Sequence, residues 1–272
     1  MIRDNGIGTV LPAPGQGVYV HALTVTGPEE LEVTRSTDGT LELEEVGDET
    51  EAAQIGSAVG TESSPGECSD RAYTDRDHAV KGDPVWYFNP RTIPNELSRE
   101  SALRAIRNGT ANILNMRNNC GRGNVVPNHV SMAYDGSTRD QAGIGSNGGC
   151  ENDRKTVVSF GKLPRSALAV TCTYYSGDPG YERVHWSDIK INKTSYNWTT
   201  RPGSRCKGKH DLASTVTHER GHTFGLGHVS ESSHARLTMS YRSNGPCQGS
   251  ERSLGLGDWK GLCGKYRDPR DC

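Results

Sequence analysis

The run from His218 to His228 reads HERGHTFGLGH and constrains the fold more than any other stretch of this 272-residue chain. On a helix, His218 and His222 are four positions apart and lie on the same face, where both can bind one metal ion. If the helix continued straight, His228 would lie about 15 Å along the axis from His218, too far to bind the same ion. We therefore expect the helix to end at Gly225, because glycine adopts the left-handed conformation of helix ends without steric cost.

Three histidines on one zinc ion leave one coordination position open, which distinguishes a catalytic zinc site from a closed structural one. Water can occupy that position, and zinc lowers the pKa of the water to about 7. Glu219 follows His218 directly and is well placed to take a proton from the zinc-bound water and pass it to a leaving amine. We expect one catalytic Zn²⁺ on His218, His222 and His228, with Glu219 as general base in the hydrolysis of a carbonyl compound, most simply a peptide bond.

Two other functions remain open for this motif. In a non-catalytic binding module, a closed or blocked zinc site would only stabilise the fold, although a structural zinc needs neither an open position nor a glutamate beside it. Alternatively, a zinc hydrolase would act on a substrate other than protein. The motif also has a simpler interpretation, in which the histidines are solvated or packed in the core without any metal.

The segment from Leu237 to Tyr241 reads LTMSY. Together with the histidine motif it resembles the metzincin zinc metallopeptidases, most closely the secreted bacterial matrixin-like proteases. The resemblance implies that Met239 forms the Met-turn, whose methionine lies beneath the zinc histidines. The resemblance also implies a catalytic role for Tyr241, as a further zinc ligand or as a group that stabilises the reaction intermediate. The alternative is that Tyr241 only packs, which is the commoner fate of a partly buried aromatic side chain.

Hydrophobic patterns upstream of the motif predict several strands and a helix. The expected strands are 86–89, 156–160, 167–175 and 184–192, and the expected helix is 98–116 with Ser98 as its cap. The resemblance implies an α+β fold with a twisted mixed sheet, a backing helix, an active-site helix and a lower subdomain that contains the Met-turn and begins near Gly225. It also implies that strand 167–175 is an exposed edge, where a substrate peptide adds as an antiparallel strand. Residues 253–262 resemble the start of the helix that closes this fold.

The chain departs from vertebrate matrixins in its metal sites, because no second cluster of histidines and acids is found. Residues 135–140 can bind Ca²⁺, but two acids around a glycine more often form a solvated turn. Six other histidines have no partner at ligand spacing, and none is assigned to a metal. They are His21, His78, His129, His185, His210 and His234.

Eight cysteines, an even number without Cys-x-x-Cys spacing, favour disulfides and an oxidising environment over a zinc ribbon. Cys206 and Cys247 flank the motif on both sides and are expected to pair. Proximity in the chain suggests the pairs Cys120–Cys150 and Cys263–Cys272. The two cysteines that are left form the last pair, Cys68–Cys172.

Residues 1–67 contain thirteen acidic residues but only Arg3 and Arg35, a formal balance of 2 − 13 = −11, so the remainder carries −2 + 11 = +9. This asymmetry divides the chain into an N-terminal extension, 1–67, and a catalytic domain, 68–272. Strand-like runs at 18–25, 30–34 and 40–43, the last two in hairpin style around Asp38-Gly39, predict a small β-rich unit, and residues 47–67 have the composition of a linker. The extension is interpreted either as an inhibitory propeptide over a basic protease surface or as a solvated acidic segment. A further alternative makes the Cys68 thiolate a blocking zinc ligand, but residues 65–70 do not match the matrixin switch motif.

The expected environment is extracellular. No apolar run approaches the length of a membrane span, and no signal peptide is visible in residues 1–30, which argues against export, but the cysteine content favours a secreted protein. The positive charge of the C-terminal region is dispersed, so nucleic acid is not expected as a partner. We expect a monomer that binds a protein or peptide substrate.

Overall fold

A nine-stranded mixed sheet organises the part of the chain that the computed structural model describes, namely residues 2–4, 7–24, 29–45, 64–126, 130–177, 182–267, 270 and 272. The strand order is β5-β4-β3-β11-β12-β10-β8-β9, with β7 paired to β12 outside this path. Its strands are β3 (Gln16–Thr24), β4 (Glu29–Arg35), β5 (Leu41–Glu45), β7 (His78–Ala79), β8 (Val85–Phe88), β9 (Ala133–Ser137), β10 (Val157–Gly161), β11 (Ala167–Ser176) and β12 (Glu182–Asn192).

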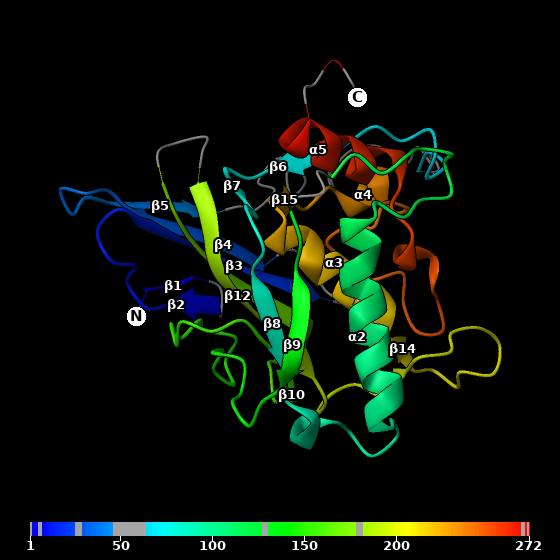
Figure 1. The fold of residues 1–272 in the computed structure, drawn as a ribbon. Helices are drawn as coiled ribbons and strands as arrows, with labels where there is room; N and C mark the ends of the chain where they lie inside the picture. The colour runs from blue at the N-terminus through cyan, green and yellow to red at the C-terminus, as the bar shows by residue number, and fades with distance from the viewer. Residues whose placement is uncertain are drawn as a thin grey trace, which may run out of the picture.

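Short strand pairs and helices complete the described fold. The pairs are β1 (Ile2–Asp4) with β2 (Ile7–Thr9), β13 (Trp198–Thr199) with β14 (His210–Asp211), and β6 (Thr74–Asp75) with β15 (Leu226–Gly227). The α-helices are α2 (Arg99–Leu114), α3 (Leu212–Thr223), α4 (Glu231–His234) and α5 (Leu256–Tyr266), and 3-10 turns span Pro90–Thr92 and Ser250–Arg252. Helices α2 and α3 lie together on one side of the sheet (Figure 1). This arrangement is compatible with the expected α+β class.

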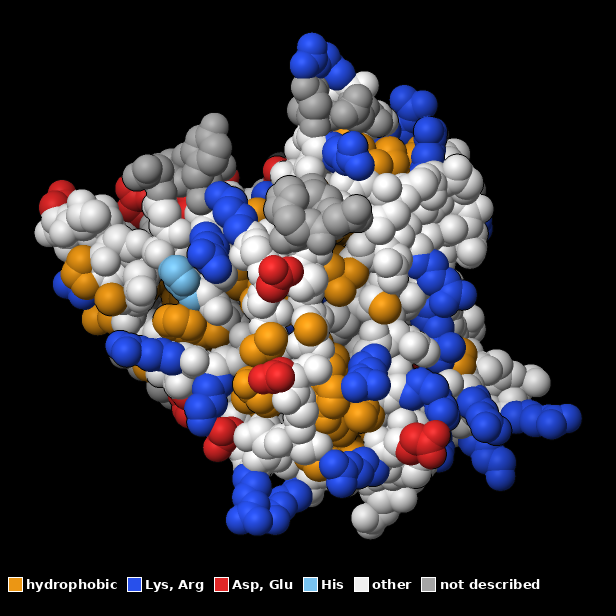
Figure 2. Space-filling view, in the orientation of Figure 1, with side chains coloured by type: hydrophobic (Ala, Val, Ile, Leu, Met, Phe, Trp, Pro, Cys, Tyr) orange, Lys and Arg blue, Asp and Glu red, His pale blue; other side chains and the backbone are white. Residues whose placement is uncertain are grey.

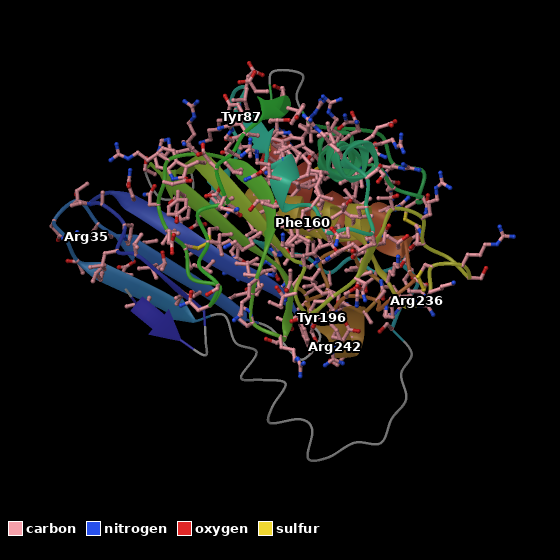
Figure 3. All side chains as sticks on the ribbon, turned by 90° about the horizontal axis from the view of Figure 1, so that it is seen from below. Arg35, Tyr87, Phe160, Tyr196, Arg236 and Arg242 are labelled. Carbon is pink, nitrogen blue, oxygen red and sulfur yellow. A yellow bond between two sulfur atoms is a disulfide. The ribbon has the colours of Figure 1, made fainter. Side chains whose placement is uncertain are left out.

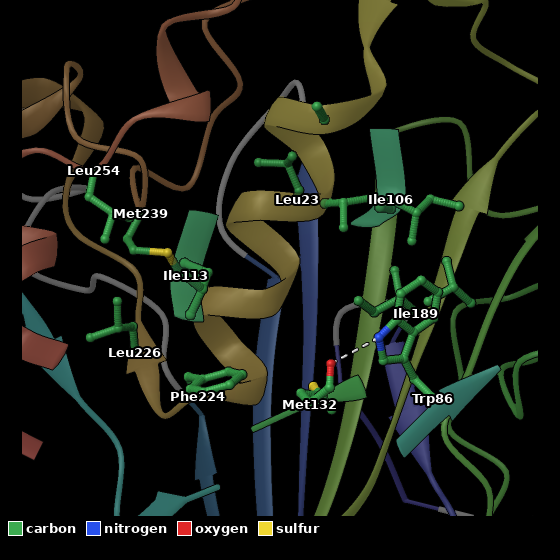
Figure 4. Packing of buried hydrophobic residues seen from close by; sticks show 14 of the residues in the cluster. Leu23, Trp86, Ile106, Ile113, Met132, Ile189, Phe224, Leu226, Met239 and Leu254 are labelled. Carbon is green, nitrogen blue, oxygen red and sulfur yellow. Dashed lines mark hydrogen bonds between the residues drawn. The ribbon is translucent and has the colours of Figure 1, made fainter. Parts of the chain in front are cut away.

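Two hydrophobic clusters cover the two faces of the sheet. The larger cluster includes Ile106 from α2, Val216 from α3 and Ile189 from β12, so it fills the space between the sheet and the helices (Figure 4). The smaller cluster, on the opposite face, joins Val20 of β3 to Cys172 of β11 and to the loop that follows β9. Side chains alternate between the faces of a strand, so β3 contributes Leu23 to the larger cluster and Val20 to the smaller one.

The strand expected to be an exposed edge is in fact a central strand. β11 pairs antiparallel with β12 on one side and with β3 on the other, from Gln16 opposite Ser176 to Thr24 opposite Ala167. The expectation is wrong because nine residues from the N-terminal region satisfy the hydrogen-bonding groups along this edge, which would otherwise face solvent.

The remaining expected elements agree well with those observed. The predicted helix and the four strands predicted within residues 68–272 correspond to α2, β8, β10, β11 and β12, and the Ser98 side chain accepts a hydrogen bond from the backbone of Ser101. The N-terminal hairpin corresponds to β4 and β5 and follows β3. Most of the expected linker, namely residues 47–63, lies outside the described residues. The expected boundary between residues 67 and 68 stays a prediction, and the sheet itself is continuous across the two parts. Seen from below, Arg35 of β4 lies far out on one side, whereas Phe160 of β10 lies near the centre (Figure 3).

The disulfides confirm two expected pairs and correct two others. Cys206 pairs with Cys247 and Cys263 with Cys272, as expected. The expected pairs Cys120–Cys150 and Cys68–Cys172 are wrong, because Cys68 pairs with Cys120 and Cys150 with Cys172. The physical reason is placement: the loop after β9 crosses the outer face of β11, which brings Cys150 to Cys172 in the smaller cluster. Four disulfides fit the expected oxidising environment.

Charged side chains are spread over the visible surface. Lys and Arg side chains appear at many places on the face shown in Figure 2, over several elements. Within the described residues, no helix is both long and apolar enough to cross a membrane.

Candidate metal centre

Helix α3 carries the first two histidines of the motif and is buried along its whole length. Asp211 caps its first turn by accepting a hydrogen bond from Ser214 N, and Arg252 holds the same carboxylate with contacts of 2.6 and 2.7 Å. The helix ends at Thr223, and Gly225 has a φ of 90°. A β-carbon on Gly225 would lie 2.3 Å from the backbone oxygen of His78, so both the turn and the close packing require glycine.

The turn at Gly225 brings the third histidine of the motif back to the first two. The Nε2 atoms of His218 and His222 lie 3.0 Å apart, and those of His218 and His228 lie 3.2 Å apart. A fourth histidine, His21 of β3, joins them, with its Nε2 in short contact with Nε2 of His228. One ligand atom from each of the four imidazoles falls within 4.8 Å of all the others. This group can hold a metal ion.

Hydrogen bonding on the far side of the rings supports metal binding. Nδ1 of His218 lies 2.7 Å from Thr238 O, and Nδ1 of His222 lies 2.7 Å from Leu226 O. A carbonyl oxygen only accepts, so each Nδ1 carries the proton and each Nε2 presents a lone pair to the centre of the cluster. Lone pairs that converge at about 3 Å repel each other unless a cation lies between them. The donor set therefore fits a metal that prefers imidazole.

Glu30 of β4 supports the third histidine. Its Oε1 lies 2.6 Å from Nδ1 of His228 and accepts a hydrogen bond from the His228 backbone at 3.2 Å, while its Oε2 accepts one from Arg76 at 2.7 Å. Burial alone would raise the pKa of Glu30, but His228 and Arg76 lower it to about 2. A carboxylate behind a ligating imidazole fixes the ring orientation and increases its basicity.

Glu219 is fully buried beside the cluster. Its Oε2 accepts a hydrogen bond from the hydroxyl of Thr171 in β11 and lies 3.5 Å from Nδ1 of His21. Burial raises the pKa of Glu219 to about 8, against the opposing effect of hydrogen bonds from Thr171 and from the backbone of Leu23. A metal ion in the cluster would lower this pKa, because a nearby cation stabilises the carboxylate.

The residues of the expected Met-turn also lie near the cluster. Met239 is buried against α3 (Figure 4), and a β-carbon on Gly221 would lie 2.3 Å from its sulfur. The Asp258 carboxylate accepts hydrogen bonds from the backbone of Thr238 and Met239 and so fixes this turn. The ring of Tyr241 lies 6.2 Å from the ring of His228, centroid to centroid.

Burial lowers the pKa of His218, His222 and His21. It lowers the pKa of His218 to about 3 and that of His222 and His21 well below the ordinary value of 6.5, with further lowering from the neighbouring imidazoles. Neutral imidazole is the form that binds a metal.

The other candidate ligands lie outside this group. His78 contacts the backbone oxygen of His222 through its Nε2, and His234 pairs with Asp70 at 2.9 Å. His185 contacts Ser176, His210 packs beside Tyr196, and His129 lies outside the described residues. In the loop considered for Ca²⁺, Asp140 pairs with Lys155 and Asp135 accepts a hydrogen bond from Tyr87. The described residues bring no group of three ligating side chains together there.

His21 and Glu30 are the residues that the sequence analysis missed. Neither lies at ligand spacing from the motif, because β3 and β4 reach the site through sheet pairing about 200 residues away in the chain. The acidic bias of the first 67 residues was a hint of contact with the rest, but it did not point to these two side chains. The chain matches no model of a known protein family, and no curated protein is similar to it.

Proposed function

We propose that this protein is a secreted zinc-dependent endopeptidase of metzincin architecture. The observation that carries the proposal is a buried glutamate, Glu219, beside three converging imidazoles, two on α3 and the third brought back by the turn at Gly225. This set matches the residues that the resemblance assigns to catalysis. Four disulfides support the secreted location.

When bound, zinc supplies a Lewis acid that acidifies water and polarises a carbonyl group. His218, His222 and His228 would hold the ion, and the rings of His218 and His222 are fixed by Thr238 O and Leu226 O. Glu219 takes the proton of the attacking water at its carboxylate and donates it to the leaving amine.

Several neighbouring residues position this group. Thr171 orients the Glu219 carboxylate through its hydrogen bond, and Met239 supports the histidines from below by packing against α3. The Tyr241 ring, near His228, is placed to stabilise negative charge on the substrate oxygen. The edge of β11 binds the substrate as an antiparallel strand once β3 has left it.

A second candidate function, a non-catalytic module stabilised by a closed zinc site, is favoured by one observation. His21 makes the cluster a four-histidine group, and four protein ligands are typical of structural zinc. Glu219 favours the peptidase, because a closed structural site has no use for a buried carboxylate beside it and burial of such a group costs free energy.

The two functions differ in the role of Glu219. We expect Glu219→Ala to keep one zinc per chain and to abolish casein hydrolysis, whereas Glu100→Ala, on the exposed face of α2, keeps both. Activity is measured with a chain cut at a specific protease site inserted within residues 46–63, because β3 covers β11 in the intact chain. A chelator should abolish the activity and added zinc should restore it. Full activity of Glu219→Ala would contradict the mechanism, and a zinc-loaded, cut protein without activity would favour the binding module.

A further inference from the structure

Strand β3 lies where an extended peptide would bind to β11. It pairs antiparallel with β11 over its full length, and the register places His21 opposite Thr171, the residue whose hydroxyl holds Glu219. Addition of a strand to a free sheet edge is a general mode of peptide recognition. β3 is therefore a peptide of the chain itself, bound across the candidate active site.

One face of β3 engages the reactive groups directly. His21 and Leu23 point to this face, two residues apart as strand geometry requires. The imidazole of His21 contacts the metal-binding histidines, and its Nδ1 lies 3.5 Å from the Glu219 carboxylate. Leu23 itself is only 1% exposed and belongs to the cluster around α3. β3 therefore covers the metal-binding histidines, the general base Glu219 and the edge of β11 at the same time.

No covalent link holds the N-terminal strands to this site apart from the chain itself. All eight cysteines lie at residue 68 or later and pair with one another. Cys68 in particular is bound to Cys120, so its thiolate does not serve as a blocking ligand. A break between β5 and Cys68 would leave the described N-terminal strands held without covalent bonds, by sheet pairing, apolar contacts, hydrogen bonds and ion pairs such as Arg76 with Glu30.

We propose that residues 1–45 are a built-in inhibitor in which β3 imitates a bound substrate and His21 is a removable fourth ligand of the metal. This inference rests on the proposed peptidase function. The remaining three histidines keep the metal when β3 leaves, and Glu219 and β11 become free together. The formal charge of residues 1–45, 2 − 8 = −6, is opposite in sign to the +9 of residues 68–272 and favours their association.

Metal coordination provides a test that does not depend on peptidase activity. The intact wild-type chain is loaded with zinc, and X-ray absorption should count four imidazoles. Loaded with Co²⁺, it should show little change in its visible spectrum on addition of acetohydroxamate. His21→Ala should lose one imidazole, keep the metal, and bind acetohydroxamate at least about tenfold more tightly, because no protein ligand has to be displaced. His185→Ala, on an exposed part of β12, is the matched control and should behave as wild type.

The outcomes separate the inference from the proposed function. Three imidazoles in the wild-type protein, or equal hydroxamate affinity in wild type and His21→Ala, would overturn the inference and leave the three-histidine site intact. Failure of the wild-type chain to bind metal would overturn both. The imidazole count in the wild-type protein does not require any variant to fold.

Discussion

At the scale of single residues, Glu30 connects the N-terminal strands to the histidine cluster. Its carboxylate lies 2.6 Å from Nδ1 of His228 and pairs with Arg76. We expect Glu30→Gln to lower zinc affinity by about tenfold, because outer-shell partners of ligating histidines typically contribute this much. Competition with a chelator measures the change, and Glu42→Gln, exposed on β5, is the control. Equal affinity of the two variants would mean that Glu30 does not support His228.

We expect the buried carboxyl group of Glu251 to make the stability of the folded chain depend on pH, independently of any bound metal. Glu251 is buried, accepts a hydrogen bond from the backbone of Asn244, and burial raises its pKa from 4.5 to about 7. The folded chain therefore holds this proton more tightly than the unfolded chain, and stability decreases as pH rises from about 4.5 to 7. Glu251→Gln should remove this loss and be more stable than wild type at pH 8 by about 1–3 kcal/mol.

Urea unfolding at pH 4 and pH 8 checks the Glu251 prediction. Wild type and Glu251→Gln should differ more at the higher pH, while Glu100→Gln, exposed on α2, should follow wild type at both. A difference that is the same at both pH values would show that the carboxyl group of Glu251 does not titrate between them.

At the scale of elements, α3 packs so closely on Met239 that a β-carbon at one of its glycines would require the methionine side chain to move. A β-carbon on Gly221 would lie 2.3 Å from the sulfur of Met239, whereas one on Gly264, in α5, would have no atom within 4 Å. Both glycines are helical, so alanine improves helix propensity by about 1 kcal/mol at each. We expect Gly264→Ala to be stabilising and Gly221→Ala to be destabilising by about 1–3 kcal/mol through overpacking. Urea unfolding compares the two variants, and equal stabilisation would show that Met239 moves aside without cost.

The elements that the sequence predicted are those with local signals. The period of apolar residues indicated α2, and β-branched and aromatic runs indicated β11 and β12. The motif itself predicted that the three histidines converge and that the helix ends at Gly225. On a straight helix His228 would lie too far from His218 to bind the same ion. Strand pairing has no such local signal, since a strand can pair with any compatible edge. For this reason the pairing of β3 with β11, the position of His21 beside the motif histidines and two disulfide pairs were not predicted.

At the scale of the whole molecule, the covalent connection between β5 and Cys68 decides how strongly the N-terminal strands hold the site. A tethered segment acts at an effective concentration of about 1 mM, whereas a cut segment acts only at the concentration of the protein. We expect an intact chain to hydrolyse a fluorogenic peptide slowly at every dilution. After cutting at a site inserted within residues 46–63, the rate per molecule should rise as the protein is diluted from about 10 µM to about 10 nM, a thousandfold loss of inhibitor concentration on the mass-action scale.

Salt gives an independent check of the same release. Charges of opposite sign on the two parts of the chain attract less strongly when ions screen them, so added salt should speed dissociation of residues 1–45 after the cut. Size-exclusion chromatography follows dissociation directly, and the peptide assay follows the exposed site. His21→Ala, once cut, should need less dilution than wild type to reach the same rate, because its N-terminal segment has lost the contact with the metal. If the cut chain releases residues 1–45 but its rate matches that of the intact chain, β3 does not control access to Glu219 and the metal.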